Sequence, residues 1–370
     1  MDLDFVTATT RYEGWLRSQV DVIEKELRYK HRQMASRASA FPFFRGTYYR
    51  WAQIWPQFCP ECEAAPTVLS IGDLHVENFG TWRDYDGRLV WGINDFDETD
   101  DLPFTNDLVR LATSAVLGAA TGKFGLSLKL ICGAILSGYT AALKNGGQPF
   151  VLEENHLELR ALAMQADREP VKFWKGLEKG LSAHDPDLSD SVKMMLLKDI
   201  PGASANCRFS AREKAGMGSL GKPRYVALAT FNGGLVAREA KAMTLPATAS
   251  LEENSQKKSR IADVLGSAVR CADPIYRVDD SWIIRRLAPR CSRIELNKLD
   301  GVSEKLMFES MGAETANIHL GTPEALKPIL KWLGAQESGW LEKAAVKMSD
   351  ATRDDWRLWH KHQKTSQGLD

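Results

Sequence analysis

Two apolar segments of this chain read as buried strands, and each of them ends in acidic residues. The segment PTVLSIGD (66–73) ends at Asp73, and RLVWGIND (88–95) ends at Asp95. Between them, TWRDYDGRLVW contains an Asp-Gly pair, which is typical of a tight hairpin turn. Such a hairpin brings both strand ends to one edge, where buried charge is costly without a cation. The pattern therefore predicts a cation site built from Asp73, Asn78 and Asp95.

The same three residues match the needs of phosphoryl transfer. That reaction requires a carboxylate that orients or deprotonates the attacking hydroxyl, and oxygen ligands that hold Mg²⁺ against the phosphates. Asp73 fits the base, Asn78 fits a metal-binding amide on the same loop, and Asp95 fits the second metal ligand. Two neighbours have two interpretations each. His75 contacts substrate or phosphate, or it satisfies backbone groups of its own loop; Asp97 supports the metal site, or it caps the next turn.

Composition limits the partners and the compartment. The 370 residues include 48 basic and 48 acidic side chains, so no net charge favours nucleic acid or an anionic membrane. The N-terminal segment lacks the pattern of a signal peptide, and charged residues and glycines interrupt the apolar stretch 108–143. We therefore expect two buried helices joined near Gly122, no membrane association and a cytoplasmic protein. Only Cys59 and Cys62 are closely spaced, and zinc would need a second ligand pair, so free thiols are expected.

A glycine-rich loop, GMGSLG (216–221), lies between two segments with strand patterns. A dinucleotide fold needs a helix after such a loop, whereas a glycine loop between antiparallel strands covers nucleotide phosphates in protein kinases. The alternative is an ordinary glycine-rich hairpin. In the nucleotide interpretation, four loop residues bind the cofactor ATP: Gly216, Gly218, Ser219 and Gly221. The strand after Asn232-Gly233 then supplies a cation for the phosphates, which we assign to Arg238 or, as the second choice, to Lys241.

The secondary-structure pattern changes twice along the chain. Helical patterns dominate first, short alternating strand patterns follow, and helices return after about residue 302. DPIYRVDDSWIIRRLAP predicts two strands around an Asp-Asp-Ser turn. The predicted α+β organisation is a first part of a large helical lobe over 1–200, a small β-rich nucleotide-binding lobe over 201–290, and the remaining helices of the large lobe over 291–370.

Several of these motifs resemble those of known proteins. GDLHVENFG resembles the catalytic loop of aminoglycoside phosphotransferases and related small-molecule kinases, and INDFDE with TNDLVRLA resembles their metal-binding loop and following helix. FPFFRGT, GDLHVENFG, INDFDETDDLPFTNDLVRLATS and GMGSLGKPRYVAL together are similar to a bacterial family of uncharacterised, kinase-like proteins. The matching motifs extend from about residue 30 to 320.

The resemblance implies a two-lobed kinase-like fold that uses ATP and Mg²⁺. It gives Asp73 the role of base and Asn78 and Asp95 the role of metal ligands, and it makes Gly216, Gly218 and Gly221 the phosphate cover. It also implies that Asp107 anchors the catalytic loop. The family usually has lysine at the position that we assign to Arg238.

The order of the motifs is unusual, because the glycine loop follows the catalytic loop by about 140 residues. Segment 307–322 resembles the helix that precedes the catalytic loop in small-molecule kinases. Joining the two ends of the chain restores the familiar order, with a hinge near Arg286, Leu287 and Ala288. We therefore expect a circularly permuted kinase-like fold. A protein tolerates permutation where the new chain ends lie on the surface and the contacts of the fold are preserved.

Two further assignments concern the partners of charged residues. Residues 250–272 are expected to form a helix, and Glu252 or Glu253 near its start is a candidate partner for the strand cation. Arg45 lies in an apolar segment, so it pairs with a buried carboxylate or, in the minority interpretation, contacts substrate.

The sequence thus favours a Mg²⁺-dependent, ATP-using phosphotransferase with an unidentified acceptor, a small molecule or a protein. One alternative is a nucleotide-binding regulator without transfer activity, suggested by Arg238 in place of lysine, and another is nucleotidyl transfer. A remote alternative is an iron enzyme with His75, Glu77 and His156 as ligands. The acceptor and the oligomeric state are not set by the sequence.

Overall fold

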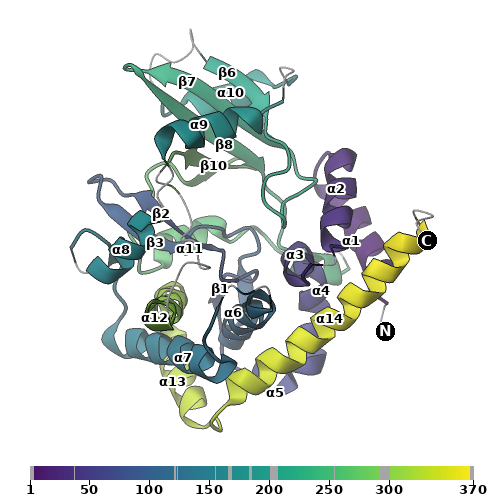
Figure 1. Ribbon diagram of the computed structural model, residues 1–370, viewed down its shortest axis with the longest axis vertical. Coiled ribbons are helices and arrows are strands. Elements are labelled where there is room, and N and C mark those ends of the chain that lie inside the picture. Colours follow the sequence, from purple (N-terminus) through teal and green to yellow (C-terminus); the bar gives the residue numbers. More distant parts are fainter. Residues whose placement is uncertain are drawn as a thin grey trace.

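The computed structural model describes residues 4–366 apart from 37, 121, 123, 155, 166–168, 183–185, 201–206, 254, 290 and 292–300. In this part of the chain helices surround three antiparallel sheets, which makes a mixed α+β architecture (Figure 1). None of the helices in the described ranges combines the length and the apolar character that a membrane span requires.

The largest sheet has five strands in the order β6-β7-β8-β10-β9. Asn232 and Gly233, with φ of 49° and 81°, form the turn between β7 and β8, which confirms the hairpin expected from this pair. The Asp-Asp-Ser turn likewise joins β9 to β10 as predicted. The strands are β6 (Cys207–Ala211), β7 (Arg224–Phe231), β8 (Gly234–Ala242), β9 (Arg277–Asp279) and β10 (Trp282–Leu287).

Two helices pack against opposite faces of this sheet. Helix α10 (Asp190–Leu197) contacts the face that carries Ala240, and α9 (Pro170–Lys179) contacts the face that carries Ala237. This division follows from the strand period of two, because neighbouring residues of β8 point to opposite sides. Both helices precede residue 200, so the layer around the sheet begins upstream of the predicted boundary.

The two acid-ended segments form strands of different sheets. Strand β1 (Thr67–Ser70) pairs with β4 (Asp100–Pro103), and β3 (Leu89–Ile93) pairs with β2 (Phe79–Arg83) and β5 (Phe150–Val151). The β2–β3 hairpin turns at Gly87, whose φ is 75°. Both strands therefore exist where the sequence places them.

Long helices form the other end of the molecule (Figure 1). They are α6 (Phe104–Ala119), α7 (Leu128–Asn145), α12 (Gly301–His319), α13 (Leu326–Gly334) and α14 (Trp340–Ser366). Helices α7 and α12 approach closely because each has a glycine at the crossing: a Cβ on Gly138 would lie 1.9 Å from the Glu309 carbonyl oxygen, and one on Gly312 would lie 2.0 Å from that of Ile135. The break near Gly122 separates α6 from α7, as predicted.

Shorter helices pack around these elements. Along the chain they are α1 (Phe5–Gln19), α2 (Glu24–Met34), α3 (Phe41–Gly46), α4 (Tyr48–Phe58), α5 (Pro60–Glu63), α8 (Leu157–Gln165) and α11 (Ile261–Ser267), with 3₁₀ turns η2 (Ala247–Leu251) and η4 (Pro323–Ala325). The first and last helices lie side by side, and the rings of Phe5 and Trp359 are 5.5 Å apart (Figure 1). The two ends of the described chain are therefore neighbours in space.

One predicted helix forms only in part. The segment 250–272 contains the end of η2 and the short α11, with irregular backbone between them. Thr248 donates a hydrogen bond to Asp100 at 2.5 Å, and Lys257 forms an ion pair with the same carboxylate. These contacts bind the start of the segment to β4 in a non-helical conformation.

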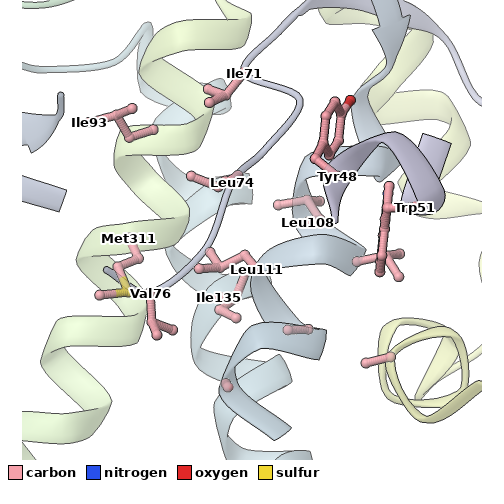
Figure 2. Packing of buried hydrophobic residues seen from close by; sticks show 14 of the residues in the cluster. Tyr48, Trp51, Ile71, Leu74, Val76, Ile93, Leu108, Leu111, Ile135 and Met311 are labelled. Carbon is pink, nitrogen blue, oxygen red and sulfur yellow. The ribbon is translucent and has the colours of Figure 1, made fainter. Parts of the chain in front are cut away.

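The main hydrophobic core supports the loop that follows β1. Ile71, Leu74 and Val76 are almost fully buried, and they pack against α6, α7 and α12 (Figure 2). Leu108 and Met311 are among the side chains that receive them. The loop 71–78 is thus held by apolar side chains that alternate with its polar residues.

Candidate functional site

Three polar residues of the 71–78 loop line a small cavity of about 40 Å³. Asp73, His75 and Asn78 face it from this loop, and Asp95 and Asp97 face it from the segment after β3. The structure therefore brings together the acids that the sequence singled out, although β1 and β3 belong to different sheets.

Asp107 on α6 holds the start of this loop. Its carboxylate accepts hydrogen bonds from the backbone N–H groups of Ile71 at 2.8 Å and Gly72 at 2.9 Å. His319 Nε2 lies 3.0 Å from the same carboxylate, and the Tyr139 hydroxyl lies 2.8 Å from His319 Nδ1. Burial would raise the pKa of Asp107, but the hydrogen bond and charge of His319 outweigh it, and the pKa is lowered. These contacts make Asp107 an anchor for the loop.

Asp73 is bound on one side and open on the other. Arg110 Nε donates to Asp73 Oδ1 at 2.8 Å, and the fully buried Arg110 guanidinium stacks on the Phe44 ring at 4.0 Å. Burial raises the pKa of Asp73, and the positive charge of Arg110 offsets only part of that rise. A carboxyl with a raised pKa is better matched to proton transfer than an exposed aspartate.

The glycine loop (216–221) lies across the cavity from Asp73. A Cβ placed on Gly218 would be 3.6 Å from Asp73 Oδ2, and Gly216, Gly218 and Ser219 all line the small cavity. Helix α2 holds the end of the loop, because Gly221 N–H donates to Glu26 Oε2 at 3.3 Å. Gly221 therefore packs against α2, whereas the other three predicted residues face the cavity.

Asn78 and Asp95 offer oxygen atoms at this cavity. Asn78 Nδ2 donates to the Asp73 carbonyl at 2.6 Å, which leaves Oδ1 for another partner. The Asp95 side chain is 43% exposed and lines both this cavity and a larger neighbour. Two such oxygens suit Mg²⁺, which binds through few protein ligands and substrate phosphates. Over the described residues, no group of three or more His, Cys, Asp or Glu side chains is placed to hold a metal ion.

Of the two strand residues considered, Lys241 lies at the acids, which corrects the first assignment to Arg238. Lys241 Nζ lies 2.5 Å from Asp97 Oδ1 and 3.3 Å from Asp95 Oδ1. Arg238 points to the opposite face of β8, where it donates to the carbonyl of Asp199 at 3.2 Å, after α10. The physical reason is the strand alternation, which places residues 238 and 241 on different faces.

Asp97 is held between two lysines. The charges of Lys241 and of the buried Lys222, 3.9 Å from Asp97 Oδ2, overcome the effect of burial and lower the pKa of Asp97. The candidate partners Glu252 and Glu253 do not take this place: both are exposed, and Glu252 lies 3.6 Å from Lys257. Asp97 is thus the acid that pairs with the strand cation.

Glu98 is a further carboxyl at the small cavity. It accepts a hydrogen bond from the Ala247 N–H at 2.6 Å, and burial raises its pKa to about 7. Lys222 lowers the pKa of Glu98 and so limits this rise.

His75 and Arg45 form a polar group beside the glycine loop. Arg45 donates to Glu77 Oε2 at 2.6 Å, and Arg45 Nε lies 3.3 Å from His75 Nε2, so Arg45 pairs with a carboxylate as expected. His75 Nδ1 accepts from the Glu77 N–H at 3.1 Å, so this histidine satisfies the backbone of its own loop. His156 packs instead on Phe150, and with His75 and Glu77 it does not assemble the alternative iron site.

A larger cavity of about 370 Å³ adjoins the first. Asp95, Gly216 and Ser219 line both, and the predicted hinge residues Arg286, Leu287 and Ala288 line the larger one. Three arginines also face it, two from the five-stranded sheet and one directly after β6: Arg224, Arg285 and Arg212. All three bind the fully buried Glu239, whose pKa they lower against the effect of burial.

Sequence reasoning missed several of these residues. They are Lys222, Glu98, Arg110, Glu239 and the three arginines around Glu239. A usable signal was present for some of them, because Glu239 and Lys241 are two residues apart on one strand and must share a face. For Arg110 and Glu98 no local pattern indicates the partner, since the partners lie on distant segments of the chain.

Comparisons with known proteins add one match. Residues 22–178 match the model of a family described as "Uncharacterized protein conserved in bacteria (DUF2252)". The matched segment contains the 71–78 loop, Asp95 and Asp107, and it ends before the glycine loop. No curated protein and no solved structure matches the chain. The similarity to an uncharacterised bacterial family therefore has support, whereas the likeness to kinases is a proposal.

Proposed function

We propose that the protein is a Mg²⁺-dependent phosphotransferase that uses ATP as the donor and a small molecule as the acceptor. The observation that carries the proposal is the meeting of two distant segments. The glycine loop lies over Asp73, with Asn78 and Asp95 lining the same cavity. Glycine-rich turns, a carboxylate base and oxygen metal ligands are the parts that phosphoryl transfer requires.

The architecture supports a circularly permuted kinase-like fold. The glycine loop joins the first two strands of the five-stranded sheet, and the third strand, β8, carries Lys241. Helix α12 ends beside the 71–78 loop, since His319 contacts Asp107. The first and last described helices are neighbours, since Phe5 contacts Trp359, and this supports a permutation, which needs chain ends that lie close together.

In this proposal each residue has a defined task. The acceptor hydroxyl attacks the γ-phosphorus of ATP, the bond to the β-phosphate oxygen breaks, and Asp73 accepts the hydroxyl proton. Arg110 keeps the Asp73 carboxylate oriented, while Lys241 holds Asp95 and Asp97 in place beside the phosphates. Asn78 and Asp95 would hold Mg²⁺, which supplies charge neutralisation for the phosphates.

The position of Lys241 bears on the regulator alternative. That alternative depended on arginine in place of the usual lysine, and a lysine on the same strand faces the acids. The identity of the strand cation is therefore no argument against phosphoryl transfer.

The test is the release of labelled phosphate from γ-labelled ATP with Mg²⁺, with water as the acceptor. We expect Asp73→Asn to lower turnover by about 10²–10⁴-fold while ATP still binds, and Asp95→Ala to lose Mg²⁺-dependent ATP binding. Burial raises the pKa of Asp73, and the base works only when it is deprotonated. As the pH is lowered, wild-type turnover should therefore begin to fall at a pH above the usual Asp pKa of about 3.9.

Asp86→Asn is the matched control, because Asp86 is 78% exposed in the β2–β3 turn. Its turnover should equal that of the wild type. Full Mg²⁺·ATP affinity and turnover in Asp95→Ala would refute the metal assignment. Transfer of label from α-labelled ATP would instead indicate nucleotidyl transfer.

A further inference from the structure

Three arginines form a compact group at the larger cavity, and we call them the arginine triad: Arg212, Arg224 and Arg285. Arg212 Nη1 and Arg285 Nε each lie 2.6 Å from a Glu239 carboxylate oxygen, and Arg224 Nη1 lies 3.3 Å from it. The register explains the group, because Arg285 is directly opposite Glu239 on the paired strand. One buried carboxylate thus orients three guanidinium groups toward the cavity.

The triad has more positive charge than Glu239 can neutralise. Three guanidinium groups face one carboxylate, which leaves a charge of about +2 in a partly buried place, and such charge is costly without a counter-ion. The whole cavity has the same bias, since six arginines line it against three acids, Glu77, Asp95 and Asp273. Arg45 is already engaged by Glu77.

Two further arginines at this cavity carry buried N–H groups without partners. In the described residues, Nε and Nη1 of Arg270 and Nε of Arg286 have no hydrogen-bond acceptor. Unmet donors of a positive group favour an anion with several oxygen atoms.

The triad also touches the glycine loop. Arg224 Nη2 donates to the Ser219 hydroxyl, and a Cβ on Gly216 would lie 3.4 Å from the same nitrogen. Asp95, the candidate metal ligand, lines the cavity as well. An anion on the triad would therefore lie between the glycine loop and the metal ligands.

We propose that the arginine triad binds the phosphate chain of a nucleoside triphosphate, so that the protein recognises the triphosphate more strongly than the base. This inference rests on the proposed function, and it specifies the donor class: purine and pyrimidine triphosphates bind alike. Guanidinium groups bind phosphate oxygens through paired N–H donors, which makes them the natural partners of such a chain.

The experiment measures binding by calorimetry to the full chain in the presence of Mg²⁺. The probes are inorganic tripolyphosphate, ATP, UTP and adenosine. We expect ATP and UTP to bind within about tenfold of each other, tripolyphosphate to compete with both, and adenosine to compete poorly. Arg212→Gln and Arg285→Gln should each weaken tripolyphosphate binding by about tenfold or more. Both side chains are about a quarter exposed, at 27% and 25%.

Arg238→Gln is the control, because this arginine lies on the opposite face of the same sheet. A preference for ATP over UTP well above tenfold, or unchanged tripolyphosphate affinity in both triad variants, would overturn the inference. The comparison of ATP with UTP needs no variant, so it holds even where a substitution impairs folding. Tripolyphosphate binding through the triad without any transfer of γ-label would refute the proposed function alone. Transfer of γ-label, together with tripolyphosphate affinity that is unchanged in Arg212→Gln and Arg285→Gln, would refute this inference alone.

Discussion

Replacing Lys241 with methionine tests which strand residue serves the site. The change removes the ammonium group and keeps most of the side-chain volume in a place that is only 2% exposed. Arg238→Met, three residues earlier, removes a cation from the other face of β8. The two variants thus separate a general loss of charge in the sheet from a loss at the site.

The two substitutions should cost similar stability. Lys241→Met removes a charge-assisted hydrogen bond of 2.5 Å to Asp97, worth about 1.5–3 kcal/mol, while Lys222 remains 3.9 Å from that acid. Arg238→Met removes hydrogen bonds to the carbonyls of Ala237 and Asp199, at a cost of about 1–3 kcal/mol. Affinity for Mg²⁺·ATP should differ, because only Lys241 faces the acids: we expect a loss of about 10–100-fold for Lys241→Met.

Urea unfolding gives the stability of each variant, and calorimetry gives its affinity for Mg²⁺·ATP. Wild-type affinity in Arg238→Met with a large loss in Lys241→Met would support the reasoning. The opposite pattern, with affinity lost in Arg238→Met and kept in Lys241→Met, would show that the face assigned to the nucleotide is wrong.

Two further predictions concern stability. Asp107→Ala leaves the N–H groups of Ile71 and Gly72 and the ring of His319 without an acceptor. At about 1–2 kcal/mol for each group, we expect urea unfolding to show a loss of about 3–6 kcal/mol in the free energy of unfolding. A loss under about 1 kcal/mol would contradict the anchor role. Glu98 has a pKa of about 7 in the folded protein against an ordinary value of 4.5, so the folded state holds the proton longer and wild-type stability should fall, by up to about 3 kcal/mol, as pH rises from about 4.5 through about 7. Glu98→Gln should remove only the Glu98 contribution, because burial also raises the pKa of Glu314 to about 7. Equal slopes for the two proteins in unfolding measurements would argue against the role of Glu98.

Local signals predicted much of the secondary structure. The Asn232-Gly233 turn and the break near Gly122 lie where the sequence places them, because glycine and asparagine tolerate positive φ and mark turns by themselves. The helix expected over 250–272 forms only over Ile261–Ser267, whereas Asp100 on a distant strand binds Thr248 and Lys257. Ion pairs across the fold leave no periodic trace in the sequence.

For the candidate site, the sequence by itself determined which residues could do the chemistry: strand ends with acids at Asp73 and Asp95, and a glycine loop at 216–221 suited to phosphates. Only the tertiary structure decided that these segments meet, and that Lys241, not Arg238, faces them. It also decided that Glu239 gathers three arginines at the same cleft. The reason is physical: turn and strand preferences act over a few residues, whereas strand register and helix packing set which side chains converge across more than a hundred residues of chain.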